Sequence, residues 1–137
     1  MKPEDIAKAG TEHAHQAALF CWAYAKAYDQ WPELKWMYAI PNGGERQAAQ
    51  AARLKAEGVK SGVSDVCLPV AKRGYHGMYM EMKKPGSDGK AAGKESPQQK
   101  EFAQFITDGG YLYRCCYDWE TAAKTVAWYM GIEDGTY

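Results

Sequence analysis

The stretch from residue 62 to residue 83 holds the side chains that are best placed to do chemistry. Asp65 begins one alternating apolar stretch, and Glu81 and Lys83 stand two residues apart in the next. Side chains on a β-strand alternate between faces, so Glu81 and Lys83 share one face, and a hairpin brings Asp65 beside them. Two neighbouring carboxylates repel each other, and a divalent cation relieves that repulsion. The pattern therefore indicates a site for Mg²⁺ or Mn²⁺. Lys83 would be placed there to orient or deprotonate a water, or to neutralise charge on a phosphate.

A second interpretation of the same residues is a hairpin whose polar face is simply solvated. An Asp followed at a distance by Glu-x-Lys occurs in many strands that have no catalytic role. The elements around the hairpin must therefore decide between the two interpretations.

Capping residues divide the rest of the chain into helices. Thr11 precedes a predicted helix over residues 12–29, Ser96 and Pro97 begin one that ends near Asp108, and Asp118 begins the last. In the first helix, Glu12 and Gln16 fall on the inward stripe with Leu19, Phe20 and Ala23. In the second, Phe102, Phe105 and Ile106 are predicted to face the core. The last has an apolar stripe made by Trp119, Ala122, Ala123, Val126 and Met130.

Strands and turns fill the intervals between these helices. Residues 36–40 and 111–116 are predicted strands, and an Ala-rich helix over residues 45–57 ends at Gly58. The loop after residue 40 holds Asn42 and two glycines, which let backbone approach a ligand closely. Residues 1–10 are predicted to form a short arm. The expected fold is one α/β domain over residues 1–137, with a mixed central sheet flanked by helices.

Composition narrows the function classes. A hydrophobic fraction of 46% and a charged fraction of 25% are ordinary for a soluble globular protein. No apolar run is as long as a membrane span and no secretory leader is evident, so a cytoplasmic protein without a membrane partner is expected. The four cysteines lack the spacing of zinc or iron–sulfur sites and are expected to be reduced thiols. The three histidines (His13, His15 and His76) are expected at the surface.

Charge is distributed unevenly along the chain although the net charge is zero. Between Arg46 and Lys100 there are 11 Lys and Arg against 5 Asp and Glu, an excess of +6 that the flanks balance with 6 against 12. Because this basic segment contains the hairpin, nucleic acid is a candidate partner. Scattered solubilising lysines would give the same count, and that alternative stays open on charge alone.

The order of these features resembles the VRR-NUC branch of the PD-(D/E)xK nuclease superfamily. The resemblance rests on residues 62–65 (Gly-Val-Ser-Asp), 81–83 (Glu-Met-Lys) and 96–99 (Ser-Pro-Gln-Gln), with the Asn-Gly loop and the first helix in their expected places. It spans nearly the whole chain and implies a restriction-endonuclease-like core. The sequence departs from the family at Ser64, where members often have proline, but this position shapes a turn and supplies no ligand.

The resemblance also implies roles for individual residues. The metal ligands would be the carboxylates of Asp65 and Glu81, the backbone carbonyl of Met82 and, through water, Glu12. Lys83 would be the catalytic lysine, and Gln99 would orient Lys83 or the phosphate. Contacts to DNA would come from Lys84, Lys90, Lys94 and Asn42, without reading of bases.

The function implied is a Mg²⁺- or Mn²⁺-dependent DNA endonuclease that selects DNA by structure. By analogy with stand-alone VRR-NUC proteins of phages, we expect a homodimer that acts on branched DNA. A four-way (Holliday) junction is the favoured substrate. A clustering of aromatic residues in and after the first helix fits such a subunit interface, and closure over a sheet edge in a monomer fits it nearly as well. Two other functions remain open: a non-cleaving nucleic-acid-binding module with the same fold, and a small-molecule hydrolase, which the basic loop disfavours.

Overall fold

The structure is a computed structural model and describes residues 1–41, 47–87 and 91–137. Its helices are α1 (Pro3–Ala7), α2 (Glu12–Asp29), the 3₁₀ helix η1 (Pro32–Trp36), α3 (Ala48–Ala56), α4 (Pro97–Asp108) and α5 (Trp119–Met130). Its strands are β1 (Tyr38–Ala39), β2 (Val66–Leu68), β3 (Met78–Met82) and β4 (Leu112–Cys116).

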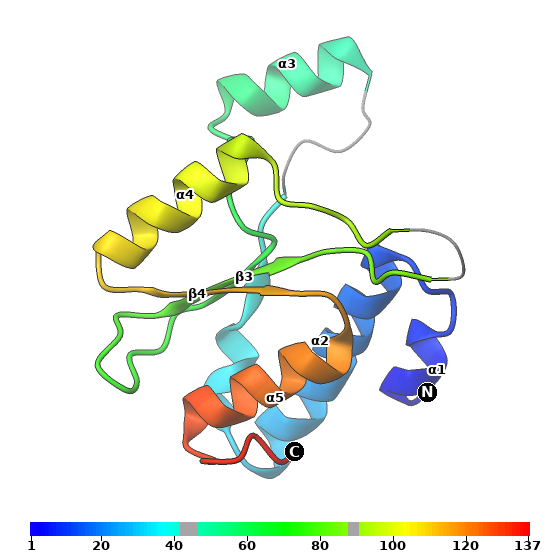
Figure 1. Cartoon of the computed structure of the whole chain (residues 1–137), viewed down its shortest axis with the longest axis vertical. Coiled ribbons are helices and arrows are strands. Elements are labelled where there is room, and N and C mark those ends of the chain that lie inside the picture. The colour runs from blue at the N-terminus through cyan, green and yellow to red at the C-terminus, as the bar shows by residue number, and fades with distance from the viewer. Residues whose placement is uncertain (42–46, 88–90) are drawn as a thin grey trace.

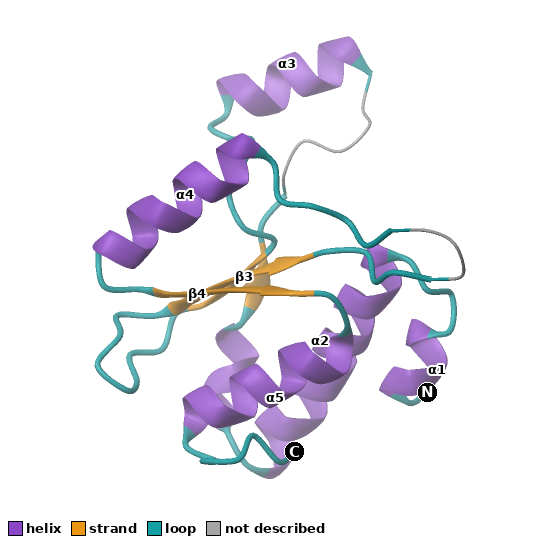
Figure 2. Cartoon of the chain, in the orientation of Figure 1, coloured by secondary structure: helices purple, strands orange, loops and turns teal. Residues whose placement is uncertain are grey.

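One sheet with the strand order β1-β2-β3-β4 forms the middle layer (Figures 1 and 2). The first three strands are antiparallel neighbours, and β4 runs parallel to β3. A parallel pair needs a crossover connection, and α4 supplies it on one face of the sheet. Helices α2 and α5 cover the other face (Figure 1). The predicted fold class, a mixed sheet flanked by helices, is confirmed.

The hydrophobic core lies between the sheet and the helices α2 and α5. The alternation in β3 places its three methionines in this layer, where each is at most 2% exposed. The stripe predicted for the last helix is buried as expected, and Asp118 caps that helix by accepting the Thr121 N–H at 2.7 Å. The sheet and helix residues that complete this core include Val66, Leu68, Leu112, Ala18, Leu19, Trp22, Ala122, Ala123 and Val126.

The opposite face of the sheet is covered by α4. The ring of Phe102 packs edge-on against Tyr79, with centroids 5.3 Å apart, and Ile106 is buried. The prediction that Phe105 faces the core is wrong, because its side chain is 75% exposed. The helix turns by about 100° between successive residues, so burial of Ile106 directs its predecessor outward.

Two predictions for the N-terminal region are also wrong. Residues 3–7 form a helix, with Pro3 in its first turn, and Ile6 packs against the core. His15 is buried, and its Nδ1 accepts a hydrogen bond from the Trp119 N–H at 3.0 Å. This bond satisfies an N–H in the first turn of α5, which has no partner within the helix.

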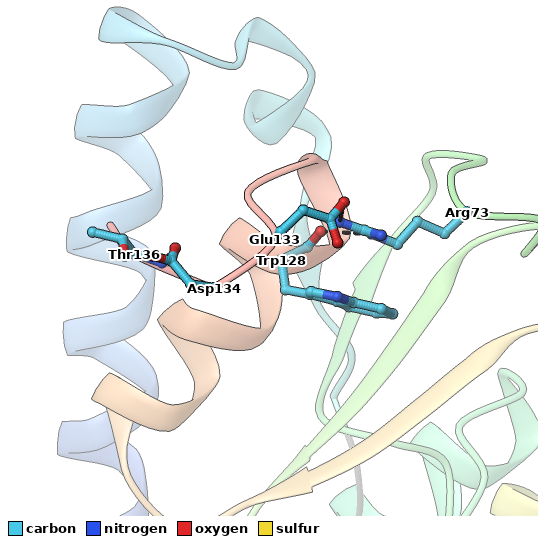
Figure 3. A network of polar contacts seen from close by, with 5 residues as sticks. All are labelled: Arg73, Trp128, Glu133, Asp134 and Thr136. Carbon is cyan, nitrogen blue, oxygen red and sulfur yellow. Dashed lines mark hydrogen bonds and ion pairs between the residues drawn. The ribbon is translucent and has the colours of Figure 1, made fainter.

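The β2–β3 turn is attached to the end of α5 by Arg73 (Figure 3). This residue has a φ of 51°, in the left-handed region. Its guanidinium lies 4.2 Å from the ring centroid of Trp128, and its Nε donates to the Trp128 carbonyl at 2.7 Å. Nη2 pairs with Glu133 at 3.0 Å. A cation at the carboxyl end of a helix also stabilises the helix dipole.

Within the described ranges, no helix combines the length and the apolar character needed to cross a membrane.

Candidate active site

Asp65 and Glu81 meet on the α4 face of the sheet. The antiparallel register pairs Val66 with Met80, so one step further it places Asp65 beside Glu81. Both side chains are buried, at 8% and 1% exposed. Asp65 Oδ2 accepts the backbone N–H of Met82 at 2.8 Å. Met82 lies beyond the end of the β2–β3 pairing, and the Asp65 carboxylate supplies the hydrogen-bond acceptor that a neighbouring strand would otherwise provide.

The carbonyl of Met82 also faces the site. The N–H and C=O of one strand residue point to the same side of the strand, as the paired bonds of antiparallel ladders require. Because the N–H of Met82 points to Asp65, its carbonyl points that way too. The next residue, Lys83, alternates and donates its N–H to the Cys116 carbonyl on the β4 side at 2.9 Å. Two carboxylates and one backbone carbonyl thus converge at the end of β3.

Gln99 links the start of α4 to Glu81. Ser96 and Gln99 form a capping box: Ser96 Oγ accepts the Gln99 N–H at 3.1 Å, and Gln99 Oε1 accepts the Ser96 N–H at 2.7 Å. The amide oxygen is thereby occupied, which leaves the amide nitrogen to donate to Glu81 Oε1 at 3.1 Å. The cap predicted at Ser96 therefore also fixes the orientation of an amide at the site.

The negatively charged form of Glu81 is unfavourable in this environment. Its Oε2 is buried and has no hydrogen-bond partner in the described part of the chain. Burial, followed by the hydrogen bond and the charge of Asp65, raises the pKa of Glu81 to about 9, and Lys83 opposes this rise. Without a metal ion, burial next to Asp65 therefore favours the protonated, uncharged form of Glu81. A divalent cation could replace that proton.

Glu12, in the first turn of α2, lies near enough to the pair to interact with it electrostatically. Thr11 caps this helix, accepting the Ala14 N–H at 3.0 Å as predicted. Burial and the charge of Asp65 raise the pKa of Glu12, and the charge of Lys83 lowers it. Glu12 also contributes to the raised pKa of Glu81. The structure therefore gathers residues from α2, the start of β2, β3 and α4 into one electrostatic cluster.

Lys83 lies half-buried beneath the base of the loop that follows β3. The Gly93 N–H donates to the Lys84 carbonyl at 3.0 Å, which brings the returning chain against the side chain of Lys83. Lys84 and Lys94 are exposed on this loop. Lys90 and Asn42, also predicted to bind DNA, lie outside the described residues.

Gly62 sets the distance between the chain before Asp65 and helix α4. Its φ is +90°, and a Cβ at this position would lie 2.7 Å from the backbone of Gln98. A side chain here would separate the two segments or strain the backbone. This close packing lets Asp65 and Gln99 approach Glu81 from two sides, and it was not evident from the sequence.

Two further residues near the site were not singled out from the sequence. Tyr113 donates its hydroxyl to Glu95 Oε2 at 2.6 Å, which holds the residue immediately before the α4 cap. Cys115 is paired in register with Glu81, and burial raises its thiol pKa to about 11, so it is a poor nucleophile. Period-two alternation in β4 places both side chains on the α4 face, but it does not reveal their partners.

The donor set suits a hard divalent cation. Among the residues described, no group of three or more His, Cys, Asp and Glu side chains gathers around one point. Two carboxylates and a carbonyl would therefore leave several coordination positions to water, as Mg²⁺ commonly requires. The buried Glu81 oxygen without a partner is the atom that such a cation would satisfy.

Comparison with known proteins identifies a family and a structural neighbour. The family model for the VRR-NUC domain matches residues 10–119. A solved structure titled "VRR_NUC domain protein" is similar with a TM-score of 0.69 and 22% sequence identity, over 88% of each chain. Curated proteins give no match.

Proposed function

Because this chain belongs to the VRR-NUC domain family, and so has the nuclease-type fold of the PD-(D/E)xK superfamily, we propose that it is a metal-dependent DNA endonuclease. The observation that carries the proposal is the buried pair Asp65 and Glu81, with Lys83 beside it and one Glu81 oxygen without a partner. A buried pair of like charges destabilises a fold unless a cation or a proton is held there.

The proposed cation is Mg²⁺ or Mn²⁺. The carboxylates of Asp65 and Glu81 and the carbonyl of Met82 would hold it directly, and Glu12 would reach it through water. When bound, such a cation lowers the pKa of a coordinated water and offsets the negative charge of a phosphodiester.

The remaining steps belong to side chains of the protein. Lys83 would hold the attacking water in line with the scissile phosphate and stabilise the charge that develops there. Gln99 would keep the Glu81 carboxylate in one orientation, because its amide oxygen is already fixed by the helix cap. Lys83 directly follows β3, and its N–H donates to the Cys116 carbonyl of β4, so the sheet holds its backbone close to the carboxylates.

Sequence-independent contacts to DNA are proposed for the loop after β3. Lys84, Lys90 and Lys94 would hold phosphates next to the cut, and Asn42 would approach the backbone from the other loop. Contacts to phosphates carry no base information, so selection would follow the shape of the DNA. Neutralising the three lysines together should weaken binding to every sequence about equally and reduce its salt dependence.

A symmetric homodimer on branched DNA, with a four-way junction as the preferred substrate, completes the proposal. Two identical sites related by a two-fold axis would cut two strands at related positions. Exposed aromatic side chains offer an interface, since Tyr24, Tyr28 and Trp36 are 65%, 92% and 63% exposed. Light scattering tests this part: a mass near 15.3 kDa with or without DNA would exclude the dimer.

One set of assays tests the function. Labelled single strand, duplex, flap and four-way junction are incubated with Mg²⁺ or Mn²⁺, with wild type beside Asp65→Asn and Glu81→Gln. We expect cleavage by wild type only, in the presence of metal, and paired nicks on the junction. Binding without cleavage by wild type would identify a nucleic-acid-binding module instead, and random single nicks on every substrate would exclude selection by structure.

A further inference from the structure

Helix α3 is unlike the other long helices because none of its nine residues is buried. Its sequence (AAQAARLKA) favours a helix through alanine, and its C-terminal end is well formed. Gly58 has a φ of +102°, the Gly58 N–H donates to the Lys55 carbonyl at 3.1 Å, and the Val59 N–H donates to the Leu54 carbonyl at 3.0 Å. These bonds form a Schellman cap.

A helix of this length has little stability by itself. Isolated helices shorter than about 12–15 residues are marginal in water, and helices in proteins draw most of their stability from a packed face. The most sheltered residue of α3 is Leu54, which is only half-buried. A partner that covers α3 would therefore stabilise it.

The charge of α3 indicates the chemistry of that partner. Arg53 and Lys55 lie in its last turn, Lys60 follows in the next loop, and the helix itself contains no acidic residue. All three side chains are on exposed residues. The other exposed positions are mostly alanines, which are small and allow a helix to approach a surface closely. A helix face of small apolar side chains flanked by cations can bind a polyanion through its negative charges.

The location of α3 connects it with the candidate active site. The loop after the helix leads to Gly62, which packs on the Gln98 backbone in the first turn of α4. Gln99, the next residue, donates to Glu81. Lys60 and Gln98 line one groove of about 530 Å³ between this loop and α4. Figure 1 shows α3 beyond the N-terminal end of α4, on the side of the sheet opposite α2 and α5.

We propose that α3 is a docking element for duplex DNA, and that Arg53, Lys55 and Lys60 bind phosphates of the arm that flanks the cut. The inference rests on the proposed nuclease function and names a second substrate contact for it. A helix with its side chains is about 10–12 Å across, which matches the width of roughly 12 Å of the major groove, so α3 can approach a duplex closely enough for its cations to reach the phosphates on the groove edge. The alanine-rich face offers no hydrogen bonds to base edges, so the contact is to the backbone and independent of sequence.

Hydrogen exchange tests the coupling between α3 and DNA. Wild-type protein is measured in EDTA, so that no cleavage occurs, with and without a duplex of arbitrary sequence. We expect amides 51–56 to exchange fast in the free protein and to become protected when DNA is added. Unchanged exchange in this segment at saturating DNA overturns the proposal. Protection that rises with protein concentration in the absence of DNA would assign α3 to a second copy of the chain and also overturn it.

Binding assays test the charges directly. In fluorescence anisotropy, Arg53→Ala/Lys55→Ala should weaken duplex binding about tenfold and lower the salt slope by about 2, because each phosphate contact contributes roughly 0.9. The control is Lys35→Ala/Lys124→Ala, which removes two exposed cations from η1 and α5 and should bind like wild type. Equal losses of affinity in both double variants would show that binding depends only on the net charge of the protein, which would overturn the proposal. If wild type binds DNA through α3 but does not cleave it, the proposed nuclease function is wrong and the docking site is still supported. If wild type cleaves DNA and the α3 variant binds as tightly as wild type, only the docking site is wrong.

Discussion

Replacing Glu81 by glutamine should make the metal-free protein more stable at neutral pH while it abolishes cleavage. The ordinary pKa of a glutamate is 4.5, and burial together with Asp65 raises that of Glu81 to about 9. Between these two pH values the folded protein binds a proton that the unfolded chain releases. The stability of the metal-free protein therefore falls as pH rises through this range. Glutamine carries no charge in either state and removes that dependence.

The size of this stabilisation follows from the difference between pH 7 and the ordinary pKa of a glutamate. One pH unit corresponds to about 1.4 kcal/mol, so protonation of Glu81 costs the folded state about 3 kcal/mol at pH 7. A glutamine oxygen can still accept from Gln99, and its uncharged N–H₂ group removes the repulsion between the two carboxylates. We expect a gain of about 2–3 kcal/mol, which for a chain of this size raises Tm by roughly 5–10 °C.

Thermal unfolding in EDTA across pH 5.5 to 8.5 measures this prediction. The Tm of wild type should fall with pH more steeply than that of Glu81→Gln, and the two should converge near the acidic end. Glu101→Gln removes an exposed carboxylate from α4 and should match wild type throughout. Added Mg²⁺ should stabilise wild type and leave Glu81→Gln nearly unchanged. A wild-type Tm with the same pH dependence as the glutamine variant would refute the assignment of a strained, proton-holding carboxyl pair.

Three further predictions concern the groups around this pair. Lys83→Ala should lose cleavage by at least about 100-fold and still bind Mn²⁺ in calorimetry, and arginine should not restore activity because its guanidinium is wider and cannot act as a base. Gln99→Glu keeps the oxygen that caps α4 but loses the donor to Glu81, so cleavage should fall about tenfold and the metal-free Tm should drop at pH 7. Gly62→Ala should cost about 2 kcal/mol or more and reduce cleavage, because it adds a clash with the α4 backbone to the strain of its positive φ. Gly58→Ala, measured by the same thermal unfolding, should lose only the strain, since nothing lies within 4 Å of its Cβ position.

Each of these predictions can fail in a specific way. Loss of Mn²⁺ binding in Lys83→Ala would make the lysine part of the metal site and not only of the chemistry. Full activity of Gln99→Glu would mean that the amide donor is dispensable. Equal losses for the two glycine variants would show that the close approach to α4 contributes nothing.

The helix starts were predictable because their signals are local, whereas the candidate ligand set came from the resemblance to a family. Thr11, Ser96 and Asp118 each accept an N–H from the first turn of their helix, a bond that depends on neighbours in sequence. The proximity of Glu81 and Lys83 follows from alternation in the extended chain at the end of β3. What made the site recognisable was the order of several weak motifs along the chain.

Properties that depend on contacts between distant segments were not predictable. The register of β3 against β4 has no local signal, and neither does the burial of His15, whose partner is 104 residues away. Alternation assigns Glu81 to one face of the sheet, but it does not show that α4 covers that face. Phe105 shows the same limit: Phe105 and Ile106 both lie one turn after Phe102, and only packing against the sheet decides which of the two is buried.

The order of strands in the sheet has a consequence for synthesis on the ribosome. Each strand pairs with the next one in the chain, so β1, β2 and β3 can associate once residue 82 has emerged. Asp65 then already has its bond partner in Met82, and the sheet that positions Glu81 exists before α4 can cover it. The methionines of β3 remain exposed on one side until α5, about 40 residues later, is made. We expect nascent chains stopped between these two points to be the species of this protein that most needs a chaperone.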